Sequence, residues 1–179
     1  ESGIILVFQL TSKIRISAIK LDGNILDRGF ILERVNSEVG KEYSKEVAER
    51  DVRKILSLYM DYGYFNARVR FTVPSEKRAV DMVPLRFEIA PYARATIGVI
   101  DFIGNLAFSE KDIQNTLEIE SNQFYQKETI ERGIYHLRER YRQEGYLSVQ
   151  VLPSQVYNSS LKTVALTFHN VEGLSLIHN

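Results

Sequence analysis

The chain repeats itself at a spacing of about 80 residues, and this repeat limits its possible folds more than any other feature. The segment at residues 19–24, which ends in Gly23-Asn24, recurs 81 positions later at residues 100–105, which end in Gly104-Asn105. The segment that leads to Gly63-Tyr64 recurs 82 positions later, ahead of Gly145-Tyr146. Because the matches keep their order over nearly the whole unit, they predict two tandem domains of one fold. Each unit is long enough to bury a small core of its own.

The repeat also predicts where the domains begin and end. We expect one domain at residues 13–92 and a second at residues 93–172. Residues 1–12 are expected to be the last strand of a preceding domain, because Phe8 lies ahead of the first repeat as Phe87 lies ahead of the second. Residues 173–179 are expected to begin a following segment.

Hydrophobic periodicity predicts the order strand, helix, helix, strand, strand within each unit. The second helix is the clearest element, because Ala48, Val52, Ile55 and Tyr59 fall on one helical face. The two closing strands alternate apolar and polar residues, and they are expected at residues 67–73 and 80–89 and, in the second repeat, at residues 147–152 and 163–171. The expected class is α+β, with each domain a three-stranded mixed sheet covered by two helices.

The repeated glycines and tyrosines are expected to be structural. Gly23 and Gly104 are expected to form turns after the first strand, and Gly63 and Gly145 to end the second helix in a left-handed conformation. A tyrosine directly after such an end packs beneath the helix. The residues of this structural signature are Gly23, Asn24, Gly63, Tyr64, Gly104, Asn105, Gly145 and Tyr146.

This order of elements, with Gly-Asn after the first strand and Gly-Tyr after the second helix, resembles the polypeptide-transport-associated (POTRA) domain. The tail at residues 168–173 looks like the closing strand of that family. The resemblance covers nearly the whole chain. Two-partner secretion transporters usually carry two such domains, and the neighbouring segments expected at both ends favour the BamA type of outer-membrane protein assembly factor.

The resemblance implies a scaffold and binding module on the periplasmic face of the bacterial outer membrane, with an organelle envelope as the alternative. It implies a C-terminal outer-membrane β-barrel on the same chain. The implied partners are unfolded outer-membrane protein clients, together with periplasmic chaperones or accessory lipoproteins. Related domains also occur in two-partner secretion transporters, in TamA-type factors and in barrel-linked patatin-like lipases, and these alternatives remain open.

The resemblance also implies where a client would bind. The sequence-second strand of each domain lies at the sheet edge, where unpaired N–H and C=O groups can pair with an extended peptide. The expected edge residues are Arg68, Val69, Arg70, Phe71 and Thr72 in the first repeat and Ser148, Val149, Gln150 and Val151 in the second. The pattern leaves open whether Arg70 or Thr72 presents the outward N–H. It also leaves open the alternative that Arg68 and Arg70 guard the edge against aggregation.

Other classes of function find little support. Lysine plus arginine equals aspartate plus glutamate, at 23 each, which argues against a nucleic-acid binder. The chain has no cysteine, and His136, His169 and His178 lack metal-ligand spacing. We therefore expect no catalytic, cofactor-binding or metal site, and no enzyme. The charged residues among positions 46–54 are expected to form the solvent-exposed face of the second helix.

Overall fold

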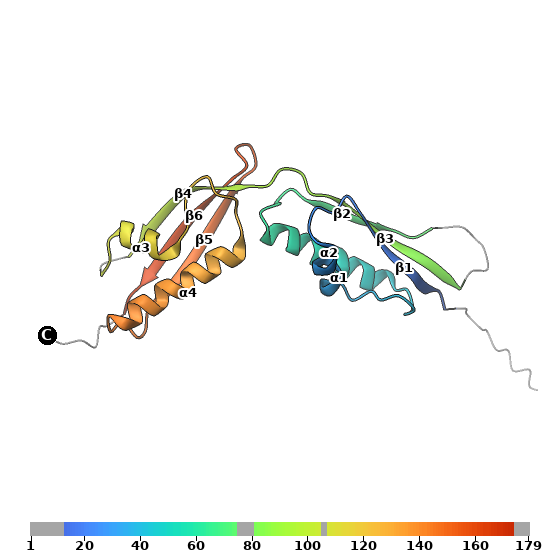
Figure 1. Cartoon of the computed structure of the whole chain (residues 1–179), viewed down its shortest axis with the longest axis horizontal. Coiled ribbons are helices and arrows are strands. Elements are labelled where there is room, and N and C mark those ends of the chain that lie inside the picture. The colour runs from blue at the N-terminus through green and yellow to red at the C-terminus, as the bar shows by residue number, and fades with distance from the viewer. Residues whose placement is uncertain (1–12, 75–80, 105–106, 174–179) are drawn as a thin grey trace, which may run out of the picture. The chain divides into compact units, whose positions relative to one another are not determined.

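The computed structural model describes residues 13–74, 81–104 and 107–173. Its Cα positions divide the chain into two compact units, one made of Glu1–Leu56 and Arg68–Ala90 and the other of Ser57–Ala67 and Pro91–Asn179. The elements, labelled in Figure 1, are β1 Arg15–Asp22, α1 Arg28–Arg34, α2 Lys45–Asp61, β2 Arg68–Thr72, β3 Met82–Ala90, β4 Thr96–Ile103, α3 Glu110–Leu117, α4 Lys127–Gln143, β5 Gln150–Asn158 and β6 Thr163–Val171.

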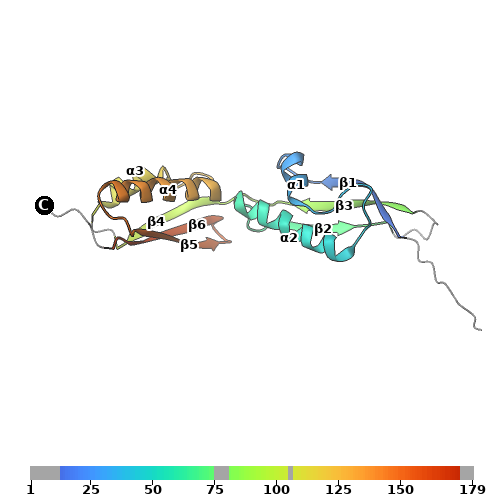
Figure 2. The same cartoon turned by 90° about the horizontal axis from the view of Figure 1, so that it is seen from below.

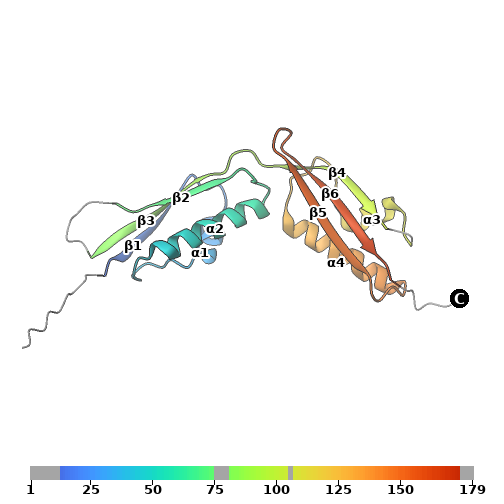
Figure 3. The ribbon, with the colours of Figure 1, turned by 180° about the vertical axis from the view of Figure 1, so that it is seen from behind.

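Each repeat forms a three-stranded mixed sheet, as the sequence predicts. The strand orders are β1-β3-β2 and β4-β6-β5, so the last strand of each repeat is central. That central strand runs parallel to the first strand and antiparallel to the second. Figure 3 allows the order β4, β6, β5 to be followed, and Figure 2 shows α3 and α4 on one face of that sheet. The other face of each sheet is not covered by these helices.

The cores lie between the helices and the covered face of each sheet. In the first repeat the buried residues include Ile16, Ile31, Ile55, Leu85 and Phe87. In the second repeat one hydrophobic cluster joins all elements, including Ile97, Ile113, Leu137, Tyr141, Val151, Leu166 and Phe168. The predicted apolar helix face is confirmed at Ala48, Ile55 and Tyr59, which are fully buried, and Val52 is partly buried.

Tyr141 is a fully buried core side chain of the second repeat whose hydroxyl makes a buried hydrogen bond. Its hydroxyl donates to Oε1 of Glu172 at 3.0 Å, and the same oxygen accepts from the backbone N–H of Ala107 at 2.9 Å. Burial, together with the Glu172 carboxylate, raises the pKa of Tyr141 well above its usual range. The phenol therefore remains a donor at neutral pH, and the Glu172 carboxylate joins α4 to the segment before α3 at the end of β6.

The first strand of each repeat contains one extra residue at the same place. The register of β1 against β3 shifts between Ile16 and Ala18, and that of β4 against β6 shifts between Ile97 and Ile100. Pro84 lies in the central strand β3, where proline is unusual. It pairs with Ala18 directly beside the bulge, and β2 pairs with β3 only from Arg86 onward. The irregular register therefore accommodates a residue that cannot donate a ladder hydrogen bond.

Three local expectations need correction. The strand β5 begins at Gln150 rather than near position 147, and it extends through Pro153 to Asn158. The first helix, which the apolar residues Phe30, Ile31 and Val35 predict over residues 28–36, ends at Arg34. Asp51, which was expected on the solvent-exposed face of α2, is fully buried. Residues 1–12 and 174–179, expected to belong to neighbouring segments, lie outside the described residues.

Candidate edge-strand binding site

The Gly-Tyr motif that precedes each candidate edge strand ends the second helix in the same way. Gly63 and Gly145 have φ of 88° and 87°, so a residue with a Cβ would be strained there. The N–H of Tyr146 donates to the carbonyl of Tyr141, and the N–H of Tyr64 donates to that of Tyr59. This is the Schellman arrangement, in which the residue after the glycine also packs against the helix end.

The rings of each tyrosine pair meet edge to face, with centroids 5.8 Å apart for Tyr59–Tyr64 and 5.9 Å apart for Tyr141–Tyr146. Both glycines thus end their helices, and both tyrosines pack against a tyrosine of the preceding helix turn.

The Gly-Asn turns hold the end of the first strand close to the central strand. Gly23 and Gly104 have φ of 74° and 79°, and a Cβ at either would collide with a backbone carbonyl, that of Ile89 or Asn170. The Asn24 side chain donates to the carbonyl of Leu26 at 3.2 Å. Asn105 lies outside the described residues.

These close approaches establish which way each backbone group of the central strand points. The carbonyl of Ile89 faces the β1 side, because it meets Gly23 at the end of β1. Backbone groups alternate sides along a strand, so Glu88 and Ala90 face β2. Their partners Arg70 and Arg68 therefore pair inward with β3. The outward N–H and C=O groups of β2 belong to Val69 and Phe71.

This geometry answers the question that the sequence left open. Arg70 pairs with Glu88 and Thr72 with Arg86, so the N–H groups of both point toward β3 rather than outward. The side chains alternate as predicted, with Arg68, Arg70 and Thr72 exposed and Val69 and Phe71 partly buried. The edge of β2 thus has outward backbone groups at Val69 and Phe71, and the side chains of these two residues are apolar and partly buried on the covered face.

The same reasoning applies to the second repeat. The carbonyl of Asn170 faces the β4 side, so β5 pairs inward through Gln150 and every second residue after it. The outward groups of β5 belong to Val151, Pro153, Gln155 and Tyr157. Ser148 and Val149, expected on this strand, lie in the turn before it.

Two residues that the sequence analysis missed act on this second edge, one from α4 and one from β5 itself. The Nη2 of Arg138 on α4 donates to the carbonyl of Val151 at 2.8 Å. Pro153 has no N–H to offer at the next outward position. The sequence analysis ended the strand at position 152, just before that proline. Proline is tolerated at a sheet edge when its nitrogen faces outward. The proline was therefore compatible with an edge strand that continues beyond position 152.

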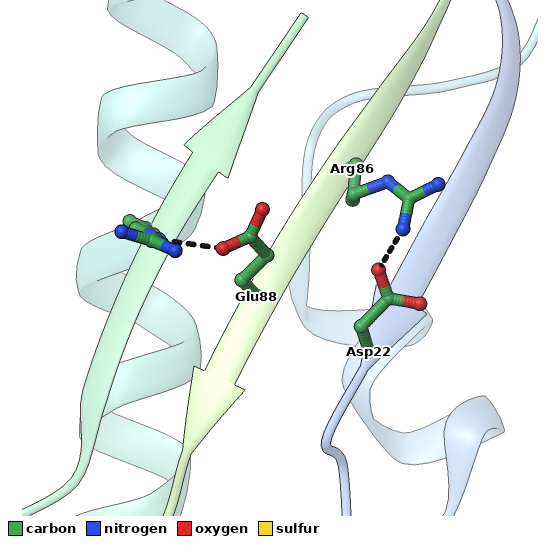
Figure 4. A network of polar contacts seen from close by, with 4 residues as sticks. Asp22, Arg86 and Glu88 are labelled. Carbon is green, nitrogen blue, oxygen red and sulfur yellow. Dashed lines mark hydrogen bonds and ion pairs between the residues drawn. The ribbon is translucent and has the colours of Figure 1, made fainter.

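The uncovered sheet faces of the two repeats differ in charge. In the first repeat Arg70 pairs with Glu88, and Arg86 pairs with Asp22, so ion pairs link all three strands. Figure 4 shows the labelled members Asp22, Arg86 and Glu88 across this face. In the second repeat the corresponding face bears Ile103, Leu152, Val156 and Val171 as exposed residues, and its ionisable residues are Asp101 and His169.

Asp51 is a second residue that the sequence analysis misread. Its carboxylate accepts from the backbone N–H groups of Asn36 and Ser37, at 2.7 and 2.9 Å, and from the Ser37 hydroxyl at 2.5 Å. Its position three residues after Ala48 and four before Ile55 already placed it on the apolar helix face. Asp51 thus ties the segment after α1 to α2.

The described residues contain no group of three histidine, aspartate or glutamate side chains that could hold a metal ion. His136 and His169 are exposed, and His178 lies outside the described part of the chain. Among the helices of that part, none combines the length and the apolar character that crossing a membrane requires.

The family comparison agrees with this geometry. The family model described as "POTRA: Surface antigen variable number repeat" matches residues 14–91 and, again, residues 95–173. These two matches span most of the chain, and the chain therefore belongs to the POTRA family. The family resemblance expected from the repeat is confirmed.

One individual relative has low sequence identity to the chain. A protein of Treponema pallidum (strain Nichols), provisionally described as an outer membrane protein assembly factor, is 24% identical over 181 residues, which cover 95% of this chain and 21% of that protein. The chain thus spans about a fifth of the length of this relative.

Two solved structures share the fold. POTRA3-5 of Haemophilus influenzae BamA superposes with a TM-score of 0.54 at 18% identity, covering 95% of this chain and 70% of that one. POTRA1-2 of Omp85 from Anabaena also gives 0.54, at 13% identity, covering 90% and 97%. At these identities the likeness shows the fold alone, and the predicted tandem POTRA fold is confirmed.

Proposed function

We propose that this chain is a periplasmic binding and scaffolding module of an outer-membrane β-barrel assembly protein. Membership of the POTRA family and the similarity to a relative described as an assembly factor support this role. In this proposal the module lies on the periplasmic face of the outer membrane and is continuous with a C-terminal β-barrel. It binds unfolded clients by strand addition and docks chaperones or accessory lipoproteins.

The observation that carries the proposal is the edge of β2. Val69 and Phe71 direct their N–H and C=O groups away from β3, which is the arrangement that an added strand requires. Backbone pairing is largely indifferent to side-chain identity, which suits a receptor that must accept many clients. The peptide bonds from Arg68 to Thr72 include no proline that would interrupt the ladder.

The side chains of β2 describe the kind of strand that fits. A neighbouring strand places alternate side chains beside those of β2 on each face. On the uncovered face these neighbours are Arg68, Arg70 and Thr72, and on the covered face they are Val69 and Phe71. A strand of alternating polar and apolar residues matches both faces, and the strands of outer-membrane barrels alternate in this way.

A titration tests the proposal. The isotope-labelled chain is mixed with an extended peptide copied from a transmembrane strand of an outer-membrane barrel, and amide shifts are followed by NMR. We expect the largest shifts at Val69 and Phe71. Shifts confined to the helices, with the β2 edge silent, would rule out strand addition.

Matched variants separate backbone pairing from side-chain effects. Val69→Pro removes an outward donor and should weaken peptide binding by about tenfold or more, the usual scale of a lost hydrogen bond with its partner left unpaired. Val69→Ala removes the same side chain but keeps the N–H, and should weaken binding less. Arg70→Pro should instead reduce stability, because that N–H faces β3. Equal loss of binding in the proline and alanine variants at position 69 would contradict backbone pairing.

A further inference from the structure

The two repeats present their edge strands differently. On β5, the carbonyl of Val151 is occupied by the guanidinium of Arg138, and the next outward residue is Pro153. An added strand would therefore have to displace Arg138 and would find no donor two residues further on. The proline ring would also occupy space beside the incoming carbonyl.

The first repeat has other residues at both positions. At the offset of 82 residues that relates α2 to α4 and β2 to β5, Leu56 occupies the position of Arg138 and Phe71 that of Pro153. A leucine side chain cannot donate to the edge carbonyl of Val69, and Phe71 retains its N–H. The two edges thus differ at both positions that bear on strand pairing.

We propose that Arg138 and Pro153 close the edge of the second repeat, so that an extended client strand is accepted at β2 and refused at β5. This inference rests on the proposed function, because it assigns strand addition to one of the two repeats. Arg138 already donates a hydrogen bond to the outward carbonyl of Val151, so a client strand would have to compete with it for this acceptor. Pro153 interrupts the ladder in the middle of the edge, which is how natural sheets block unwanted pairing.

The cost of pairing a client strand with β5 follows from two hydrogen bonds. A client pairing with β5 would lose one hydrogen bond at Pro153 and would have to replace the one that Arg138 makes at Val151. Each lost bond weakens binding by about tenfold. A peptide that binds β2 should therefore bind β5 at least about 100-fold more weakly, which is two such losses combined.

Exchanging the residues between the repeats tests the proposal. The opened variant carries Arg138→Leu with Pro153→Phe, and the closed variant carries Leu56→Arg with Phe71→Pro. Each is isotope-labelled as the whole chain and titrated with the same barrel-strand peptide. In the unmodified chain we expect shifts at Val69 and Phe71, with Val151 and Gln155 silent.

The opened variant should gain shifts at Val151 and Gln155 while keeping those at β2. The closed variant should lose those at β2. Leu56→Arg alone is the milder companion, because it adds the competing guanidinium and leaves the Phe71 ring in place. Dispersed amide spectra establish that each variant is folded.

The outcomes distinguish this inference from the function on which it rests. Shifts of similar size at both edges of the unmodified chain would overturn it. So would an opened variant that stays silent at β5 while β2 binds. Silence at β2 in the unmodified chain, with a gain at β5 in the opened variant, would contradict the proposed client edge and still support closure. Silence at both edges in every variant would overturn both.

Discussion

Asn170 has an unusual environment for a polar side chain. It is 5% exposed, and its side-chain Oδ1 and Nδ2 have no hydrogen-bond partner in the described structure. Ile89 occupies the same position in the first repeat, since each residue's carbonyl lies against the turn glycine, Gly23 or Gly104. A buried amide without partners costs free energy that an apolar side chain of similar shape avoids.

We therefore expect Asn170→Leu to raise the free energy of unfolding by about 1 kcal/mol or more. Urea denaturation followed by circular dichroism measures the change. The matched control is Ile89→Asn, which should lower the free energy of unfolding by about 2–4 kcal/mol, because it adds a buried amide and removes packed volume. A destabilised Asn170→Leu protein would mean that the amide has a partner which the leucine removes.

Asp51 is the opposite case, a buried polar group with every contact satisfied. Its carboxylate accepts from Asn36 N–H, Ser37 N–H and the Ser37 hydroxyl. Asp51→Ala should lower the free energy of unfolding by about 3 kcal/mol or more, since it leaves two backbone donors and a hydroxyl without their acceptor. Asp51→Asn should cost less, because its amide oxygen still accepts. If the alanine variant melts with the unmodified chain, water replaces the carboxylate at this site.

At the scale of elements, the position that Asp51 occupies in α2 is also a contact point in the second repeat, where α4 meets α3. Gly133 occupies in α4 the place that Asp51 occupies in α2, 82 residues earlier. A Cβ there would collide with the backbone carbonyl of Leu117, the last residue of α3. The two repeats thus join their helices by different means, one through a carboxylate and the other through a close backbone approach.

This contact sets up a test between two opposing effects. Alanine is favoured over glycine in a helix by about 1 kcal/mol, whereas overpacking against a fixed backbone costs about 1–3 kcal/mol. We expect the collision to win, so that Gly133→Ala destabilises the second repeat by roughly 1–2 kcal/mol. Thermal unfolding of this variant beside Arg132→Ala, an exposed position of the same helix, measures the difference. Stabilisation by Gly133→Ala would show that α3 can move away at little cost.

Much of the element structure could be predicted, because local chemistry determines it. The left-handed ends at Gly63 and Gly145 follow from glycine and the periodic helices before them. The segment Ser109-Glu110-Lys111-Asp112 is typical of a helix start, and the Ser109 hydroxyl accepts from the N–H of Asp112 at 3.2 Å. Here one short segment contains all the groups that make the structure.

The incorrect or missing predictions concern features that depend on residues far apart in the sequence. Residues 147–149 were expected in β5, but they form the turn that follows the helix end, which places the exposed Leu147 outside the strand. The direction of each edge N–H depends on register, and register depends on the bulges in β1 and β4. The contact between Arg138 and Val151 joins α4 to an edge strand, so the sequence pattern of either element alone does not reveal it.

At the scale of the whole molecule, both repeats bury apolar residues between sheet and helices, but their surfaces differ. The uncovered face of the first sheet carries Arg70–Glu88 and Arg86–Asp22 ion pairs, whereas that of the second exposes Leu152 and Val156. Exposed ion pairs contribute little to stability, at most about 1 kcal/mol each. The stability of each unit therefore comes mainly from its own buried apolar residues.

This division predicts that damage to one core stays within that core. Phe168 and Phe87 occupy equivalent positions on the central strands β6 and β3, and both are fully buried. Replacing a buried phenylalanine by alanine costs about 3–5 kcal/mol. Domains with separate cores unfold in separate steps when one is weakened.

We expect Phe168→Ala to lower the hydrogen-exchange protection of sheet amides such as Leu166 and Leu152, while Leu85 and Ile16 keep theirs. Phe87→Ala should give the reverse pattern, and each variant serves as the control for the other. Amide exchange followed by NMR measures both units in one sample. If either substitution lowered protection equally at Leu85 and Leu166, the two repeats would unfold as one cooperative unit, and separate cores would not account for the stability of the chain.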